Sequence, residues 1–230
     1  MKYLVSLLLG LVVGALLTAM LVFFNPLGAD NDVSPLAVTE NEVITLNFSA
    51  VPEQSLLYTN NGESRIAPHP TKVLQLWEPP IRRTAAMVTL LADSRGRPAG
   101  IGIKFSSDSE QTSLLDTAVL VDSVWHIYLP ARGSLFIEQV ENYWSYIREV
   151  VVPAYTSAGD SWKGLWRGNL TAGPTALGTA RVWGGSGAFA GLETEAVEAA
   201  TARAYAVDRG PVAIDGELVL EVPATVAAGD

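Results

Sequence analysis

Among the 24 acidic residues and two histidines of this sequence, a few side chains are candidates for acid–base chemistry. Glu138, Glu141 and Asp116 are candidate general bases, because a carboxyl group that points into an apolar interior has a raised pKa. Nothing in the sequence selects one of the three, and a carboxylate on the surface is the ordinary alternative. The sequence therefore supplies candidates for proton transfer without a motif that defines a reaction.

Asp122 and His126 are a second pair of candidate polar groups. They lie four residues apart in a predicted strand, so they share a face at a separation of ~13 Å, given ~3.3 Å per residue. That distance is too long for a direct hydrogen bond, although either side chain could pair across strands. Ser123 faces the opposite side, so this segment does not assemble a Ser-His-Asp nucleophile. A solvent-facing or core histidine is the alternative for His126.

Two tryptophans on one predicted strand suggest a ligand pocket. One face of that strand carries large and absent side chains in alternation, which suits a barrel interior with room left in it: Trp162, Gly164, Trp166, Gly168 and Leu170. We expect Trp162 and Trp166 to line a pocket for an apolar or aromatic ligand, with Trp125 and Phe189 as further lining residues. The alternative is that these rings only fill the core.

Composition excludes several classes of site. The chain of 230 residues has no cysteine and two histidines, which excludes disulfides, thiolate catalysis, cysteine-ligated metals and a histidine-rich metal site. We expect no metal and no cofactor. The net charge of −9 argues against nucleic acid as a partner.

The N-terminal segment predicts a membrane anchor. From Tyr3 to Phe24 there are 22 residues without a charge, and a helix of that length spans ~33 Å, close to the ~30 Å hydrocarbon core of a bilayer. We expect residues 1–25 to form a transmembrane anchor and residues 26–40 to form a linker. A cleaved secretory signal is the alternative, although the apolar run is long for one.

Charges on either side of the anchor predict its orientation. Lys2 precedes it, whereas Asp30 and Asp32 follow it, so the positive-inside rule keeps the N-terminus in the cytoplasm. The expected localisation is the inner (cytoplasmic) membrane, single-pass, with the C-terminal domain in a bacterial periplasm. Gly10 and Gly14 form a Gly-x-x-x-Gly pair that could pack on an integral membrane protein partner, although glycine is common in membrane helices.

Residues 41–225 predict one strand-rich domain, followed by a tail at 226–230. Apolar residues recur with period two, most regularly at 212–222, and turn sequences separate the segments. Further strands are expected at 54–59, 72–78, 84–92, 133–140, 161–170 and 176–183. Short strands with a turn about every ten residues predict an antiparallel barrel or sandwich.

Two segments of the domain are ambiguous. Residues 142–154 combine three aromatic residues with a valine run, which predicts a short helix on the barrel or a lid at its mouth. The alanine and glutamate content of residues 193–206 favours a helix. Because this segment lies between two predicted paired strands, we predict a strand there.

Three motifs in the second half of the domain carry a resemblance to a known family. They are Gly164-Leu165-Trp166-Arg167-Gly168, the run from Gly184 to Gly191 (Gly-Gly-Ser-Gly-Ala-Phe-Ala-Gly) and Asp215-Gly216-Glu217-Leu218. Together they resemble the allene oxide cyclase and dirigent barrel superfamily, over about 60 of the 230 residues. The resemblance implies an eight-stranded, lipocalin-like antiparallel β-barrel with a bulged corner at the glycine run and Phe189 plugging the barrel end. The family's active-site residues have no match in the first half of the chain.

The predicted function follows from the anchor and the barrel together. We expect a mainly β protein, an N-terminal transmembrane helix followed by one lipocalin-like barrel, that binds an apolar small molecule or is an accessory subunit of a membrane complex. A carrier should have an open apolar cavity around Trp162 and Trp166, whereas an accessory subunit should have a filled barrel and an exposed apolar patch. The alternative is an isomerase or cyclase like the family it resembles, which needs an ionisable group inside the barrel.

Overall fold

The computed structural model describes residues 2–23, 42–51, 58–60, 63–65 and 84–222. These residues are mainly β, with twelve strands in one sheet. The strand predicted at 72–78 lies outside the described residues, as does most of the one predicted at 54–59. The β content and the single sheet agree with the strand periodicity of the sequence.

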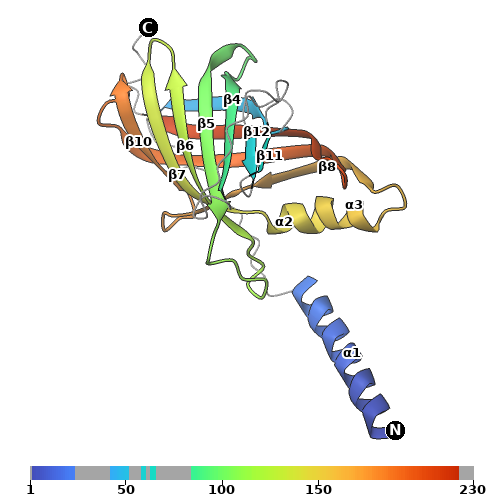
Figure 1. The fold of residues 1–230 in the computed structure, drawn as a ribbon. Coiled ribbons are helices and arrows are strands. Elements are labelled where there is room, and N and C mark those ends of the chain that lie inside the picture. The colour runs from blue at the N-terminus through green and yellow to red at the C-terminus, as the bar shows by residue number, and fades with distance from the viewer. Residues whose placement is uncertain (1, 24–41, 52–57, 61–62, 66–83, 223–230) are drawn as a thin grey trace.

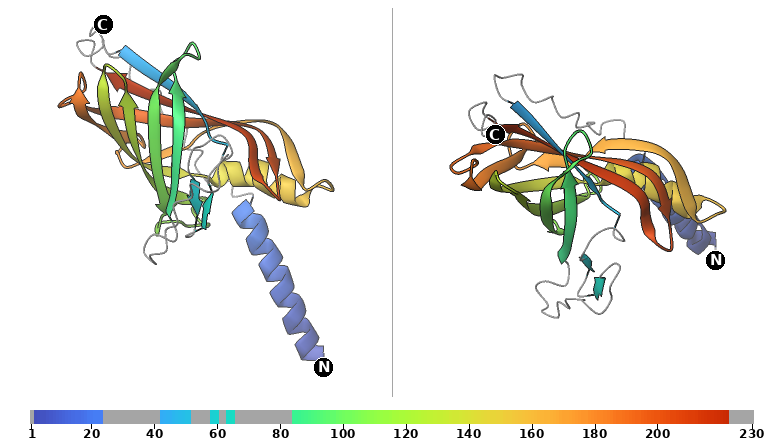
Figure 2. Two further views of the ribbon diagram at one scale, coloured as in Figure 1. Left: turned by 45° about the horizontal axis from the view of Figure 1, so that its top comes forward. Right: turned by 90° about the horizontal axis from the view of Figure 1, so that it is seen from above.

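Eight strands pair antiparallel in a ring (Figure 1). In the order of pairing they are β1 (Glu42–Ser49), β12 (Gly210–Val222), β11 (Glu193–Ala206), β10 (Ala180–Gly187), β7 (Gly133–Asn142), β6 (Leu120–Leu129), β5 (Pro98–Asp108) and β4 (Thr84–Ala92). A bridge between Asn47 and Ala92 closes the ring between β1 and β4. Figure 2 shows, in the view from above, the strands curving round a common interior.

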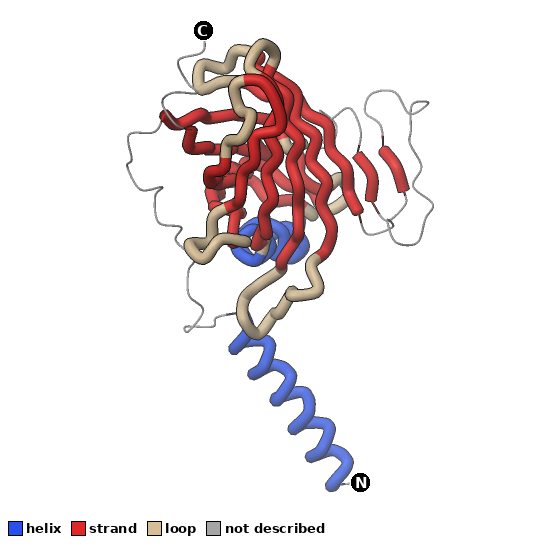
Figure 3. Tube along the Cα trace, turned by 90° about the vertical axis from the view of Figure 1, so that its left-hand side faces the viewer, coloured by secondary structure: helices blue, strands red, loops and turns tan. Residues whose placement is uncertain are grey.

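Four short or branching strands extend the ring. β2 (Tyr58–Asn60) and β3 (Glu63–Arg65) follow β4 at one edge, where Figure 3 shows them as two short segments. β8 (Ser161–Asn169) pairs with the second half of β11, and β9 (Thr171–Gly173) pairs with the last residues of β7. At this end of the ring β8 and β9 therefore take the place of β10.

A helical segment, which we call the flap, lies against this end. It consists of α2 (Trp144–Tyr146), the π-helix η4 (Ile147–Val151) and α3 (Val152–Thr156). Figure 1 shows the flap beside β8. Tyr146, Val150 and Ala154 are its buried residues. The helix predicted around 142–154 is therefore confirmed.

The side chains on the inner face of β5 are small or charged, whereas those on its outer face are apolar. Gly102 and Lys104 are buried, whereas Ile101 and Phe105 are 42% and 49% exposed on the outside. A Cβ atom on Gly102 would lie 2.7 Å from the ring of Trp125, so the indole fills the space that a larger side chain would need. Alternation along a strand therefore predicts two faces without telling which one points inward.

β11 is a strand in spite of its helix-forming composition, as predicted. It pairs with β12 along its length and with β10 and β8 in turn on its other edge. Backbone hydrogen bonds to both sides outweigh a helix propensity that is worth only tenths of a kcal/mol per residue (~0.7 at most). The predicted corner is also present, because the register of β10 against β7 shifts between Gly184 and Ser186.

The interior contains two apolar clusters. The first cluster fills the closed ring and includes Leu46, Phe48, Trp125, Ile137, Phe189 and Leu218. The second cluster lies between the flap and the strands and includes Tyr146, Val150, Trp166, Leu170, Ala200, Ala202 and Ile214. Along β11 the inward residues pass from Ala196 in the first cluster to Ala200 in the second, with Glu198 between them.

The N-terminal segment forms a helix, α1 (Lys2–Phe23), but the prediction that it is a membrane anchor is wrong. No helix in the part of the chain that the structure describes is both long and apolar enough to cross a membrane. The predicted fold class is therefore wrong in its transmembrane part, and so are the single-pass topology and the inner-membrane localisation with a periplasmic domain. A membrane contact through residues 3–24 stays a prediction.

Replacing Gly216 by alanine tests the packing of the first cluster. The ring of Phe48 lies where a Cβ on Gly216 would be, and Phe48 packs edge-on against Trp125 at 4.9 Å between ring centroids. We expect G216A to lower the free energy of unfolding by on the order of 1–3 kcal/mol in denaturant titration. Gly159→Ala is the matched control, because its Cβ would meet nothing closer than 3.6 Å. Equal stability of the two variants would contradict this packing.

Candidate functional site

Four polar side chains meet inside the closed ring, and we call them the polar centre. Lys104 comes from β5, Gln139 and Glu141 from β7, and Glu198 from β11. Their exposed fractions are 7%, 1%, 0% and 2%. Gln139 and Glu141 are two residues apart, so the strand period places both on the inner face. Because the sheet closes on itself, Lys104 reaches two strands that are not its neighbours in the ring.

Hydrogen bonds join the four side chains into one network. Lys104 Nζ donates to Glu198 Oε1 at 2.8 Å and also donates to Glu141 Oε1. Gln139 Nε2 donates to Glu141 Oε1 at 2.7 Å and also to Glu198 Oε2. On the other side of Gln139, Oε1 accepts a hydrogen bond from Thr171 Oγ1 at 3.0 Å.

Two aromatic side chains complete the network at its two ends. Trp125 Nε1 donates to Glu198 Oε2 at 2.9 Å, and the Tyr143 hydroxyl donates to Glu141 Oε2 at 3.1 Å. An indole N–H can only donate, so it favours an ionised Glu198. A phenol can donate or accept, so Tyr143 suits either protonation state of Glu141. The two carboxyl groups are therefore chemically different.

The charges of the polar centre set its protonation near neutral pH. Burial raises the pKa of Glu141 to about 7, and the charge of Glu198 adds to this effect while Lys104 partly offsets it. Burial also acts to raise the pKa of Glu198, but Lys104 and the hydrogen bonds from Trp125 and Gln139 outweigh it and lower that pKa. For Lys104, burial favours the neutral amine, yet the two carboxylates raise its pKa above the usual value. One ion pair, Lys104 with Glu198, thus stands beside a carboxyl group that exchanges a proton near pH 7.

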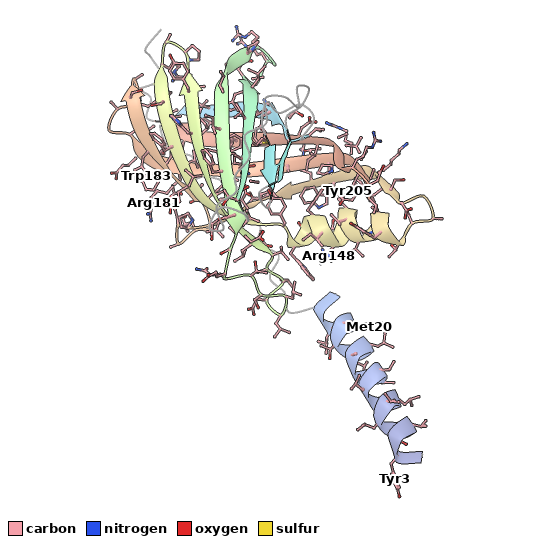
Figure 4. The ribbon with its side chains drawn as sticks, in the orientation of Figure 1. Tyr3, Met20, Arg148, Arg181, Trp183 and Tyr205 are labelled. Carbon is pink, nitrogen blue, oxygen red and sulfur yellow. The ribbon has the colours of Figure 1, made fainter. Side chains whose placement is uncertain are left out.

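Tyr143 connects the polar centre to a group of aromatic rings in the second cluster. Tyr146 lies edge-on to three rings, with centroid distances of 6.4 Å to Tyr143, 5.1 Å to Trp166 and 6.4 Å to Tyr205. We call Tyr143, Tyr146, Trp166 and Tyr205 the aromatic cluster. Figure 4 labels Tyr205 at the end of the sheet that faces the flap, and Arg148 on the flap itself. Glu141 therefore lies at the boundary between a charged network and an aromatic one.

The predicted pocket-lining residues fall into two separate places. Trp125 and Phe189 are fully buried in the first cluster, where the Arg132 guanidinium lies 5.0 Å from the ring of Phe189. Trp166 is buried in the second cluster, and Trp162 is partly buried beside it. The structure thus does not bring the four rings together, although Trp125 reaches the polar centre and Trp166 reaches the aromatic cluster.

The predicted polar groups lie on the outer surface. His126 stacks on Phe136 with ring centroids 4.6 Å apart. Asp122 and Glu138 line an outer hollow of about 250 Å³ together with Phe105, Val124 and Pro174. Asp116 is exposed and accepts a hydrogen bond from Ser113 Oγ at 2.7 Å. Of the three carboxylates considered as general bases, only Glu141 points inward.

The predicted helix-packing pair lies on α1. A Cβ atom on Gly10 or Gly14 would meet nothing within 4 Å among the described residues. The Gly14 carbonyl accepts a hydrogen bond from Thr18 Oγ1 at 2.9 Å, within the helix. A role for this pair in binding another helix stays a prediction.

Sequence reasoning missed Lys104, Gln139 and Glu198. Lys104 lies on the same strand face as Gly100 and Gly102, and this was the signal that sequence reasoning missed. Because glycine has no side chain, this face leaves room for a tryptophan from the next strand. For Glu198 the signal was a single charged residue on the same strand face as Ala196, Ala200 and Ala202. Both charged residues interrupt a period-two row of small residues that turns out to face inward.

The polar centre is not built as a metal site. Both of its carboxylates bind Lys104, which occupies the space between them. Among the described residues, no group of three or more histidine, aspartate or glutamate side chains is placed to hold a metal ion.

Fold and site together define a closed antiparallel β-sheet protein with a buried acid–base centre. No family model and no curated protein matches this sequence. Among solved structures, a nonspecific heme-binding cyclase that catalyses a cycloaddition in neoabyssomicin biosynthesis is similar at a TM-score of 0.35 and 11% identity. The match covers 81% of this chain and 66% of that chain, so this chain spans slightly less than two thirds of the neighbour's length. The Diels-Alderase AbmU from Streptomyces koyangensis is similar at a TM-score of 0.37 and 11% identity, over 87% of this chain and 79% of that one.

The two neighbours do not test the resemblance drawn from the glycine-rich motifs. Both are described as catalysts of cyclisation, and neither is described as an allene oxide cyclase. The resemblance to that family therefore stays a prediction. TM-scores below 0.5 do not carry the activity of either protein to this chain.

Replacing Glu141 by glutamine tests its protonation. The pKa of Glu141 is about 7 in the folded protein against an ordinary value of 4.5, so the folded state binds the proton more tightly. The resulting stabilisation is complete below pH 4.5 and is lost as the pH rises through about 7. We expect the wild-type free energy of unfolding to fall by up to ~3 kcal/mol more than that of E141Q across this window. Glu138→Gln should keep the wild-type slope, and a wild-type slope in E141Q would rule out the raised pKa.

Replacing Lys104 by methionine tests the ion pair. The variant leaves two buried carboxyl groups without their cation, so we expect a loss of about 3–5 kcal/mol at neutral pH in denaturant titration. The loss should shrink at about pH 5, where the carboxyl groups take up protons. Lys163→Met on β8 is the control, since Lys163 is exposed and its replacement should leave stability unchanged. A pH-independent effect of K104M would contradict the charge balance.

Proposed function

We propose that this protein is an acid–base catalyst of the isomerase or cyclase class that acts on an apolar carbonyl compound. The observation that carries the proposal is the Glu141 carboxyl group, which is 0% exposed, has a pKa of about 7 and is hydrogen-bonded to Tyr143 at the edge of the aromatic cluster. A general acid–base group works best when its pKa lies near the operating pH. Glu141 meets this condition at a fully buried position.

Each member of the site has a role in the proposed reaction. Ionised Glu141 removes a proton from the carbon next to a carbonyl group and returns a proton at another carbon, so atoms balance without a redox step. Tyr143 holds Glu141 Oε2 and supplies a hydroxyl beside the substrate. Lys104 and Glu198 are positioning residues, because their ion pair keeps Glu141 close to its protonation midpoint.

The free energy lost by burying the charged groups of the polar centre supports a functional role for them. Burying an ion pair is often no better for stability than filling the same volume with apolar side chains. Strongly shifted pKa values in buried clusters are also typical of active sites. A polar centre with one exchangeable proton is therefore better explained by proton transfer than by stability.

The two other roles considered for this domain have less support. A carrier of an apolar molecule would use Trp162 and Trp166 and would leave the buried charged residues of the polar centre without a role. An accessory subunit requires an exposed apolar surface, and the outer face of β5 to β7 carries Ile101, Phe105, Val124, Tyr128 and Phe136. That surface leaves the buried Lys104, Glu141 and Glu198 unexplained, so proton transfer is the role that the interior supports best.

Deuterium exchange tests the proposal directly. A panel of aromatic and aliphatic ketones, led by methyl naphthyl ketone, is incubated with the full-length protein in deuterium oxide, and incorporation is followed by mass spectrometry. We expect exchange next to the carbonyl above the buffer rate, and a loss of ~10²-fold or more in E141Q, because the variant lacks the base. The rate should rise with pH through about 7 as Glu141 ionises.

Two controls define the outcome. Glu138→Gln changes a carboxylate on the outer face of the same strand and should leave the exchange rate unchanged. Exchange at the buffer rate with every ketone, or equal rates for E141Q and wild type, would refute the proposed function.

A further inference from the structure

We infer that the aromatic cluster under the flap is the ligand site, and that it takes a planar aromatic molecule carrying one hydrogen-bond acceptor, which the Tyr146 hydroxyl binds. This inference names the substrate class of the reaction proposed above and in that sense rests on it. The inference draws on the second apolar cluster, whereas the proposed reaction draws on the polar centre.

The first observation is the hydroxyl of Tyr146. The residue is 7% exposed, and its hydroxyl is buried without a hydrogen-bond partner among the residues that the structure describes. A buried polar group without a partner costs ~1–3 kcal/mol, and few such groups occur in native proteins. The neighbouring Tyr143 hydroxyl, in contrast, is bonded to Glu141. Tyr146 therefore has one donor to offer to a ligand.

The second observation is the chemistry around this hydroxyl. The Tyr146 ring lies edge-on to Tyr143, Trp166 and Tyr205, with interplanar angles of 63–76°. Apolar side chains complete the surroundings, among them Leu170, Ala200, Ala202 and Ile214. Aromatic rings in such arrangements favour another aromatic ring, and the single donor favours one acceptor, such as a carbonyl oxygen. A charged ligand has no counter-ion within this cluster.

The third observation is the cover over the cluster. The flap is tied down at its two ends, where Tyr143 N donates to Val119 O at 2.9 Å and Ser157 Oγ donates to Ser161 O at 2.8 Å. Between these ends its buried side chains, Tyr146, Val150 and Ala154, are held mainly by apolar packing. The middle of the flap is a π-helix, a form that often marks functional sites. An aromatic ligand can replace such apolar contacts as the flap lifts.

The position of Tyr143 places this site next to the reacting group. Its ring belongs to the aromatic cluster and its hydroxyl is bonded to Glu141. A ketone bound to Tyr146 within this cluster would share it with Tyr143, whose hydroxyl reaches Glu141. The ligand site and the base are then parts of one active site.

A pair of ligands that differ only in the acceptor tests the site. Methyl naphthyl ketone and ethylnaphthalene have nearly the same shape, but only the ketone accepts a hydrogen bond. We expect full-length protein to bind the ketone about five- to tenfold more tightly, measured by quenching of tryptophan fluorescence, because one neutral hydrogen bond and one relieved donor contribute that much. In Y146F the two ligands should bind equally.

Control variants separate binding from folding. Tyr128→Phe removes an exposed hydroxyl on the outer face and should keep the wild-type preference for the ketone. Y146F should unfold at the same temperature as wild type or higher, because it removes a buried donor without a partner. If Y146F does not fold, Trp166→Phe serves instead, and it should weaken both ligands to the same extent.

The failures of the two proposals are distinguishable. E141Q should bind the ketone with wild-type affinity while losing deuterium exchange. A preference for the ketone that survives in Y146F, or no binding of either ligand, would overturn the site even if exchange is observed. Binding that depends on Tyr146 in a protein that does not catalyse exchange would support the site and overturn the proposed reaction.

Discussion

The interior of this protein depends on one ammonium group held between two carboxyl groups. Lys104 comes from β5, and its two partners come from β7 and β11, which are neither its neighbours nor each other's in the ring. Only a sheet that closes on itself brings these strands within the reach of one lysine. Removing the cation would leave two buried carboxyl groups, so the closure of the ring and the charge balance support each other.

The polar centre also lies between two apolar clusters that have different roles. The first apolar cluster, with Phe48, Trp125 and Leu218, fills the closed ring and stabilises it by burying apolar surface. The second cluster lies outside the closed part, beneath a flap that packs mainly through apolar side chains. Glu141 lies between the two, where burial raises its pKa while Tyr143 keeps it next to the aromatic rings. The fold thus positions a proton-transfer group between an apolar core and an aromatic cluster under the flap.

Local patterns in the sequence predicted the elements better than their arrangement. The strand at 193–206 and the helix near 142–154 were both predicted, and the bulged corner at Gly184 followed from the glycine run. The site was predicted only in part, because Glu141 was one of three carboxylates that nothing in the sequence distinguished. The uncharged N-terminal run was interpreted as a membrane span from its length, whereas no helix among the described residues is both long and apolar enough to cross a membrane.

The sequence by itself determined the β-rich domain, its turns and the absence of cysteine chemistry, because these depend on residue type and on periods of a few residues. Tertiary structure decided which face of each strand points inward, and with it the site. The same period-two pattern places Lys104 inside and His126 outside, and only the closure of the ring distinguishes the two. The pKa of Glu141 was likewise decided by tertiary structure, since it results from burial beside residues 37 and 57 positions away in the chain.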